Sequence, residues 1–226
     1  MPARIAAFAT LLLGLLASPI AMAIEEPRYQ VIEQDGAFEL RDYAAYLVAE
    51  TRVEASFTEA GSEAFRRLFR YISGNNAAQQ KIAMTAPVTQ GKGEKIAMTA
   101  PVTQVADADG YRVAFVVPSR YSASTVPKPL DPRIEIRAVP ARRVAVWRYS
   151  GRWTQERYDQ MERQLREAIV ARGLSVNGPP VLARYDPPFM PWFMRRSEVL
   201  IPEPGTVVIL LTGLLMACVL KRYRRN

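Results

Sequence analysis

The side chains that most often bind metals or carry out catalysis are scarce in this chain. None of its 226 residues is histidine, and its single cysteine, Cys218, lies in an apolar stretch near the C-terminus. Zinc or non-haem iron sites built on imidazole or thiolate, and Ser-His-Asp or Cys-His catalytic sites, are therefore excluded for the body of the chain. Carboxylates such as Asp42, Glu50 and Glu54 are present, but no two are placed as a recognisable acid–base pair. We therefore expect a binding protein rather than an enzyme.

A ten-residue stretch, Lys-Ile-Ala-Met-Thr-Ala-Pro-Val-Thr-Gln, occurs twice, as residues 81–90 and 95–104 with a linker that contains two glycines. Both copies are rich in β-branched and apolar residues, which predicts two extended segments joined by a tight turn. Pro87 and Pro101 cannot donate a ladder hydrogen bond, so each copy should lie at a sheet edge or bend there. The alternative is a local duplication that only lengthens a hairpin, because the second copy adds no new chemical group.

The Met-Thr-Ala-Pro-Val core of each copy resembles the signature of the SOUL haem-binding family. Four other segments resemble the family's pattern in the same order: Phe38–Tyr43, Pro118–Tyr121, Pro127–Leu130, and Tyr185–Pro188 followed by Arg195–Val199. The resemblance covers residues 29–201. It implies an α+β domain with a mainly antiparallel, barrel-like sheet, two packed helices, and haem or a related porphyrin as the ligand.

A porphyrin ligand needs an apolar slot for the macrocycle, cations for the propionates and, in many proteins, an axial ligand for the iron. The segment 179–198 is rich in proline and aromatic residues, and we interpret it either as a hydrophobic strap across the sheet or as the rim of a ligand pocket. The candidate haem-binding residues are Arg41, Tyr43, Phe65, Arg66, Phe69, Arg70, Lys81, Met84 and Met98.

The iron ligand is the weakest part of this pattern. In one branch of the family a histidine lies between the Arg and Tyr of the second strand, and Asp42 occupies that position here. Other members are thought to hold haem mainly by hydrophobic contact. The remaining candidates for an iron ligand are Met84, Met98, Tyr43 and Tyr71. The alternative for the methionines is a place in the core, where a strand Met is more often found, and the alternative for the helix arginines is a solvated face. The sequence therefore predicts haem binding without a histidine ligand.

A second function is compatible with the same residues. A non-enzymatic envelope protein could bind another hydrophobic small molecule, or a protein partner, through the same cleft, and duplicated domains of this kind also resemble the GyrI-like small-molecule sensors. Nucleic acid is not expected as a partner. The formal charge of +8 owes much to a basic cluster at residues 221–225, so the domain itself is only mildly basic.

Several periodic segments should position the candidate residues. Alternating apolar and polar residues predict strands at 29–33, 38–41, 46–53 and 111–117. Between them, a capping box at Ser56 and Glu59 begins a helix that ends at Gly74. Its apolar face contains Phe57, Ala60, Ala64, Phe65, Leu68, Phe69 and Ile72, and its polar face contains Glu59, Glu63, Arg66, Arg67 and Arg70.

The pattern then begins again 96 residues later. Phe38–Arg41 matches Ile134–Arg137, Arg52 matches Arg148, and Phe57-Thr58 matches Trp153-Thr154, ahead of a second helix predicted at 154–172. One such unit cannot bury both faces of its sheet and helix, whereas two can close on each other. We therefore expect an internally duplicated domain.

The N-terminus has the features of a signal peptide. Arg4 provides a positive start, an apolar run follows, and Ala21-Met22-Ala23 is a small-x-small cleavage site, so residues 1–23 should be removed on export. The apolar run is short for a membrane span. A retained anchor is the alternative.

The C-terminal segment, residues 202–226, should be a membrane tether outside the domain at 24–201. Pro202-Glu203-Pro204 precedes 14 uncharged residues, Val207–Leu220, and a basic end. A helix of that length is about 21 Å long, against a hydrocarbon core of about 30 Å, and its basic end should stay cytoplasmic. The arrangement resembles the PEP-CTERM sorting signal, which implies processing by an exosortase-type enzyme. An exported, membrane-anchored domain is expected, and a plain C-terminal anchor is the alternative.

Overall fold

The computed structural model of the chain describes residues 24–78, 93–175 and 178–202. Within these ranges the chain forms strands, two α-helices and one short 3-10 helix. In order they are β1 Tyr29–Asp35, β2 Phe38–Tyr43, β3 Tyr46–Val53, α1 Phe57–Ile72, β4 Asn76–Ala77, β5 Val102–Asp107, β6 Gly110–Val116, β7 Lys128–Pro129, β8 Ile134–Val139, β9 Arg142–Tyr149, α2 Gln155–Ala171, β10 Val181–Arg184, η1 Trp192–Met194 and β11 Ser197–Pro202.

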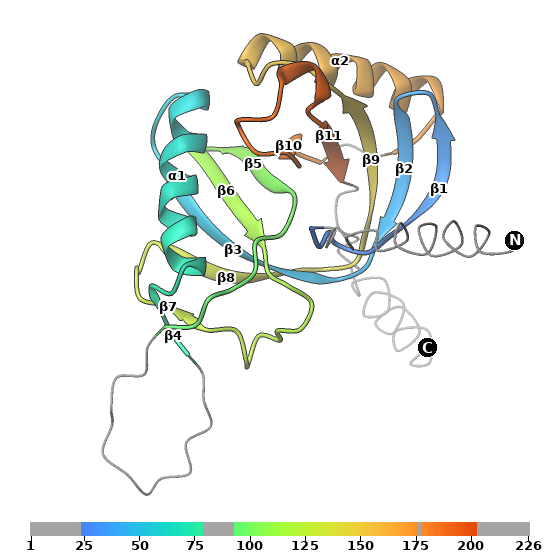
Figure 1. Ribbon diagram of the computed structural model, residues 1–226. Coiled ribbons are helices and arrows are strands. Elements are labelled where there is room, and N and C mark those ends of the chain that lie inside the picture. The colour runs from blue at the N-terminus through green and yellow to red at the C-terminus, as the bar shows by residue number, and fades with distance from the viewer. Residues whose placement is uncertain (1–23, 79–92, 176–177, 203–226) are drawn as a thin grey trace, which may run out of the picture.

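Nine of these strands form one curled, antiparallel sheet (Figure 1). The strand order is β1-β2-β9-β11-β10-β5-β6-β3-β8, and β4 and β7 form a separate small ribbon. Helix α1 packs on β3 and β6, whereas α2 packs on β9 and β11. The predicted α+β class, with a mainly antiparallel, barrel-like sheet and two packed helices, is therefore confirmed.

The two helices cover separate hydrophobic cores. Under α1, Ala64 and Leu68 pack with Phe115 in one cluster. Under α2, Leu165 packs with Val199 in another. Because each helix buries its own apolar stripe, the sheet needs both helices to cover the two halves of one face.

The predicted faces of α1 are wrong at two positions, Arg67 and Phe69. Arg67, expected on the polar face, is buried and donates to Thr51 Oγ1 at 2.6 Å and to the Arg52 carbonyl at 3.0 Å. Phe69, expected in the core, is 48% exposed. Polar groups at the end of β3 attract the arginine, and Phe69 lies one residue past the stripe through Leu68, so that it points away from the sheet.

The two rounds of strands occur where the 96-residue offset places them. Strands β2 and β8 begin 96 residues apart, as do β3 and β9, and their lengths agree pair by pair. Helix α2 also lies within its predicted range, with Thr154 as its N-cap. The N-cap side chain accepts a hydrogen bond from the Arg157 amide. At α1 the predicted capping box is wrong, because the Ser56 hydroxyl donates to the Glu59 carboxylate and does not accept a bond from a backbone amide.

The repeated stretch does not form the predicted hairpin at Val102–Gln104. These last residues of the second copy belong to β5, which pairs with β6 along one edge and with β10 along the other. A strand has only two edges, so none is left for the first copy. Pro101 lies just before β5, at a bend rather than at a sheet edge. The first copy, residues 81–90, lies outside the described residues.

The segment 179–198 is less irregular than its composition predicts. Val181–Arg184 forms β10, which pairs with β11 from Val181↔Leu200 to Arg184↔Ser197. Four residues are too few to show a period, so the surrounding prolines and aromatics hid this strand. We use the name arm for the connection between β10 and β11, residues 185–196. In the described residues no helix is long and apolar enough to cross a membrane. The predicted leader, and the tail beyond Pro202, lie outside them.

Candidate ligand-binding site

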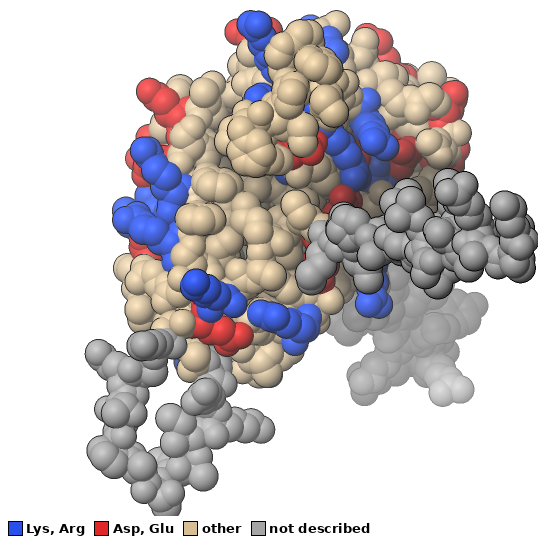
Figure 2. Space-filling model, in the orientation of Figure 1, with Lys and Arg blue, Asp and Glu red and all other residues tan. Residues whose placement is uncertain are grey.

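A mainly apolar pocket of about 640 Å³, called the main pocket below, lies between α1, the segment before β5, and the arm. Phe65 from α1, Met98 and Val102 from the β5 side, and Phe189 from the arm contribute to its walls. Figure 2 shows Lys and Arg side chains over α1 at the left edge, with a largely uncharged surface beside them. The remaining lining residues are Ile24, Thr58, Gly61, Ser62, Arg66, Thr99, Ala100, Trp153, Arg184, Tyr185, Asp186, Pro187 and Pro188.

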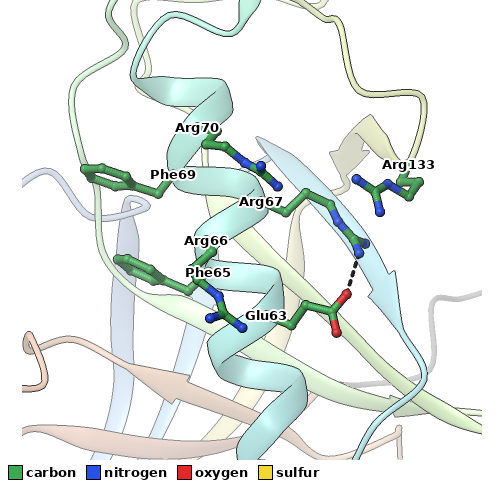
Figure 3. A pocket seen from close by; sticks show the side chains of 7 residues that line it. All are labelled: Glu63, Phe65, Arg66, Arg67, Phe69, Arg70 and Arg133. Carbon is green, nitrogen blue, oxygen red and sulfur yellow. Dashed lines mark hydrogen bonds and ion pairs between the residues drawn. The ribbon is translucent and has the colours of Figure 1, made fainter.

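A second hollow of about 520 Å³ lies on the outer side of α1 (Figure 3). Its residues are Glu63, Phe65, Arg66, Arg67, Phe69, Arg70 and Arg133. Phe65 and Phe69 stack with ring centroids 5.8 Å apart, and they project from one side of the helix, while Arg67 and Arg70 project from the other. Arg67 forms an ion pair with Glu63 at 2.7 Å. Phe65 and Arg66 border both hollows, so α1 forms a ridge between them.

The structure brings five of the predicted site residues to this region. Phe65, Arg66, Phe69 and Arg70 follow one another along α1, and Met98, which is 38% exposed, borders the main pocket with Phe65. This places two cations, two aromatic rings and one thioether around the two hollows. Lys81 and Met84 lie outside the described residues.

Arg41 and Tyr43 do not reach either hollow. Arg41 is 1% exposed, donates to both Glu198 oxygens at 2.8 and 3.0 Å, and donates to Glu39 at 2.7 Å. It also donates to the Tyr43 hydroxyl at 3.1 Å. Alternation along β2 points these side chains to the sheet face opposite the helices, where they form a buried network. Burial raises the pKa of Tyr43 to about 12, which disfavours the phenolate that would ligate iron.

Tyr71, the other tyrosine that the sequence suggested for iron, is also engaged elsewhere. It is 1% exposed, and its hydroxyl donates to the Pro127 carbonyl at 2.7 Å. Burial raises its pKa above the ordinary value. Tyr71 therefore packs α1 against the loop before β7 rather than facing a pocket.

The buried network also fixes the first part of the arm. The Tyr185 hydroxyl donates to Glu198 at 2.7 Å, and the Arg196 guanidinium lies 3.7 Å from the centre of the Tyr185 ring. Asp186 accepts a hydrogen bond from the Arg196 amide at 2.5 Å. Burial pushes the pKa of Glu198 upward, but the hydrogen bonds and charges of Arg41 and Arg196 outweigh it and leave that pKa below the ordinary value. The charged Glu198 carboxylate therefore fixes Tyr185, and with it the pocket wall at 185–186, from the side of the sheet.

Trp153 and Arg184 are two of the pocket residues that the sequence analysis did not select. Trp153 precedes α2, and Arg184 ends β10, so neither lies on the helix or in the repeated stretch that drew attention. One signal existed for Trp153, because it matches Phe57 at the 96-residue offset and both rings lie near the Arg184 guanidinium. No local pattern singles out Arg184.

The residues of the main pocket fit a porphyrin. Its volume lies in the range of about 300–1,000 Å³ that is typical of small-molecule sites, and its lining is mostly apolar with arginines at the margins. Among the described lining residues, Met98 has the one sulfur or imidazole-type donor suited to haem iron. The described residues also contain no group of three or more His, Cys, Asp or Glu side chains that could hold a metal ion. A macrocycle would thus be held here chiefly by apolar contact.

Comparison with known proteins agrees with this description. The family model of the SOUL heme-binding protein matches residues 24–92 and 89–202, in two segments that meet at the linker between the repeated stretches. Heme-binding protein 1 of Xenopus tropicalis is 28% identical over 169 residues, which are 74% of this chain and 84% of that protein. Heme-binding protein 2 of Homo sapiens is 36% identical over 81 residues, which are 34% of this chain and 40% of that protein.

Among solved structures, the C-terminal domain of EcmrR is similar in fold. It aligns with a TM-score of 0.53 at 11% identity, over 77% of this chain and 96% of that domain. At this identity the likeness concerns the fold alone. The family match, by contrast, extends over nearly the whole described domain and includes the repeated signature, the strands and the arm. The chain therefore belongs to the SOUL heme-binding protein family, which supports haem or a related tetrapyrrole as its ligand.

Proposed function

We propose that this protein is an exported, membrane-tethered, non-enzymatic protein that binds haem or a related porphyrin in the main pocket, without a histidine ligand. The observation that carries the proposal is the pocket of about 640 Å³ between α1 and the arm, lined mainly by apolar side chains and bordered by Arg66 and Arg184. Membership of the SOUL family supports the same ligand class.

The roles of the residues follow from their positions. Phe65, Val102 and the arm residue Phe189 contact the faces and edges of the macrocycle, and Arg66 pairs with a propionate at the solvent side. Met98 is the candidate axial ligand. Bound haem supplies an iron centre, whereas the chain binds and orients the macrocycle and shields part of it from water.

A metal-free hydrophobic ligand is the second candidate, and the donor set of the pocket favours it. With no histidine in the chain and one thioether among the described lining residues, iron adds little to the interaction that apolar contact provides. A porphyrin without iron, or another flat hydrophobic molecule, would then bind as well as haem.

The internal duplication forms part of the proposal, and the strand order supports it. Exchanging β2 with β8, β3 with β9, β5 with β10, and β6 with β11 turns the order β2-β9-β11-β10-β5-β6-β3-β8 into its own reverse. Two copies of one unit related by a two-fold axis would produce this order.

Export and tethering rest on the two ends of the sequence. Residues immediately after the predicted cleavage site take part in the domain, which supports a boundary at Ala23. The Glu25 carbonyl accepts a hydrogen bond from the Ala100 amide at 2.9 Å, and Glu26 pairs with Arg196 at 2.9 Å. At the other end, residues 202–226 would tether the domain to the membrane until an exosortase-type enzyme processes them. N-terminal sequencing of envelope-associated protein should find Ile24 first, and an intact Met1 would refute the export proposal.

Titration with hemin and with iron-free protoporphyrin IX tests the ligand. We expect saturable changes in absorbance with both, and a haem spectrum that lacks the bis-histidine form. Phe65→Ala should weaken both ligands, and the exposed Val170→Ala on α2 is its control. If Met98 ligates the iron, Met98→Ala alters the haem spectrum but leaves protoporphyrin affinity nearly unchanged. Absence of a saturable change with either ligand would refute porphyrin binding.

A further inference from the structure

Arg184 is a partly buried residue of the main pocket at the end of β10, and it differs from the buried Arg41 and Arg67 in its partners. Its Nη2 donates to Gln104 Oε1 at 3.2 Å. Its guanidinium carbon lies 5.1 Å from the centre of the Trp153 ring and 5.7 Å from that of Phe57. The charged group therefore lies among aromatic rings and a neutral amide.

No carboxylate among the described residues forms an ion pair with Arg184. Arg41 pairs with Glu39 and Glu198, and Arg67 pairs with Glu63, whereas Arg184 has no such partner in the described parts of the chain. Its Nε is buried without a hydrogen-bond partner. Taking a charged group largely out of water without a counter-charge is costly, so the presence of Arg184 here calls for an explanation.

The carboxylate that borders the same pocket is already occupied. Asp186 accepts the Arg196 amide and forms no ion pair with Arg184. Burial lowers the pKa of Arg184 to about 10, and no carboxylate contributes to that shift. The guanidinium still carries its charge at neutral pH, and residues 24–78, 93–175 and 178–202 supply no carboxylate that pairs with it.

The neighbouring backbone makes room for this arginine. A Cβ atom at Gly61, on the first part of α1, would lie 2.8 Å from Arg184 Nη1 and 3.1 Å from Gln104 Oε1. Gln104 is itself fixed, because its Nε2 donates to the Phe57 carbonyl at 2.9 Å. Gly61 also lines the pocket, so the space that accommodates the guanidinium opens toward the ligand.

We propose that Arg184 is an anion-binding residue of the pocket, in addition to Arg66, and that it pairs with a carboxylate carried by the ligand. A planar guanidinium matches a carboxylate through paired N–H donors, and this pairing would satisfy the charge that the protein leaves unbalanced. Trp153, which lines the pocket, would flank the ligand beside its acidic group. The inference rests on the proposed function in that the ligand occupies this pocket, and it adds that the pocket selects aromatic acids over neutral molecules of the same shape.

Three ligands test this proposal with the purified protein: protoporphyrin IX, its dimethyl ester, and 1-naphthoate as a small aromatic acid. Wild-type protein should bind protoporphyrin IX at least tenfold more tightly than the ester. In Arg184→Gln that preference should fall at least severalfold, because the acid loses one of its two arginine partners and binds more weakly while the ester is unaffected. Arg163→Gln, on an exposed position of α2, is the matched control and should retain the wild-type preference. Binding of 1-naphthoate that depends on Arg184 would show that any aromatic carboxylate suffices, and its absence beside a strong acid preference would restrict the site to porphyrin acids.

The stability of the ligand-free protein provides a second readout. Because Arg184 has no counter-charge, Arg184→Gln should leave the Tm unchanged or raise it. A fall of several degrees would show that Arg184 supports the fold and would overturn the proposal. So would equal binding of acid and ester by wild-type protein, an outcome that leaves porphyrin binding intact. If wild-type protein binds none of the three ligands, the proposed function and this inference both fail.

Discussion

Glu198 illustrates at the scale of a single residue how the interior of the sheet is held together. It is fully buried, and it accepts hydrogen bonds from Arg41, Arg196 and Tyr185. Each donor comes from a different part of the chain: a strand near the N-terminus, the end of the arm, and its beginning. The carboxylate therefore balances two cations and fixes one wall of the ligand pocket.

Replacing Glu198 by glutamine should destabilise the protein by about 3–5 kcal/mol at pH 7, because Arg41 would remain buried without its principal counter-charge. The pKa of Glu198 is lower in the folded protein than its unfolded value near 4.5. Its contribution is therefore complete above about pH 4.5 and is lost as the pH falls through the folded-state pKa. Urea unfolding of wild type and Glu198→Gln at pH 7 and pH 3 should show a smaller difference at the lower pH.

The matched control is Glu162→Gln, which removes an exposed i,i+4 pair with Arg166 on α2. Pairs of this kind contribute about 0.3–0.5 kcal/mol, so this variant should resemble the wild type. A loss below about 1 kcal/mol for Glu198→Gln at pH 7, or an undiminished difference at pH 3, would contradict the assigned role.

Sequence alone could not separate the structural arginine from the binding arginine. Arg41 lies in a family motif and was therefore a candidate for the site, but its partner Glu198 is 157 residues away. Arg184 lies beside a family motif and was not considered. What distinguishes the two is whether a distant carboxylate reaches the guanidinium, and that depends on long-range strand pairing rather than on local pattern.

At the scale of an element, α1 separates stability from binding along its two sides. Leu68 is fully buried under the helix, whereas its neighbour Phe69 is 48% exposed and stacks on Phe65. Phe65 borders the main pocket and Phe69 does not. We therefore expect Phe69 to affect ligand binding indirectly, by holding the Phe65 ring in position.

Leu68→Ala should cost about 2–5 kcal/mol of stability, because it leaves a cavity between α1 and the sheet. Phe69→Ala should change stability by less than about 1 kcal/mol but weaken porphyrin affinity about two- to tenfold, the worth of one aromatic pair. Chemical denaturation and ligand titration of the two variants test this split. Equal effects of both changes on stability would contradict it.

The helices and most strands could be predicted because their periodicity is local. Strand β3 lies at its predicted position, and strands β8 and β9 lie 96 residues after β2 and β3, as the internal match predicts. The exceptions have physical reasons. Arg67 is drawn inward by acceptors on β3, and β10 is defined only by its pairing with β5 and β11.

At the scale of the whole molecule, the second copy of the repeated stretch is the one that the described domain uses. Ile96 donates its amide to the Ile72 carbonyl, Thr99 donates to the Val116 carbonyl, and β5 begins at Val102. The family model matches the chain as two segments that overlap at residues 89–92, with one copy of the repeated stretch in each. One copy should therefore be enough for the fold.

Deleting residues 81–94 tests this directly, because removal of residues 91–104 instead gives the same sequence. The shortened chain should fold and bind porphyrin as the full chain does. Its stability should change by about 1 kcal/mol or less, since shortening the connection between Ala77 and Val102 from 24 to 10 residues alters its closure free energy by only about 0.8 kcal/mol. Far-UV circular dichroism, urea unfolding and hemin titration are the measurements. Loss of folding or of binding would show that the additional copy has a role of its own.

The last prediction concerns the junction between the domain and its tail. Pro202 is the final residue of β11, where it lies opposite Val144, and its carbonyl accepts the Gly178 amide at 2.9 Å. Cleavage that spares the sheet must therefore occur after Pro202, and the sequence predicts an extended peptide there because Pro204 and Gly205 are poor helix formers. We expect intact-mass analysis of protein from the native host to find a C-terminus between Glu203 and Thr206. Replacing Pro202-Glu203-Pro204 by alanines should abolish this processing, while recovery of the chain through Asn226 would leave a simple anchor as the function of the tail.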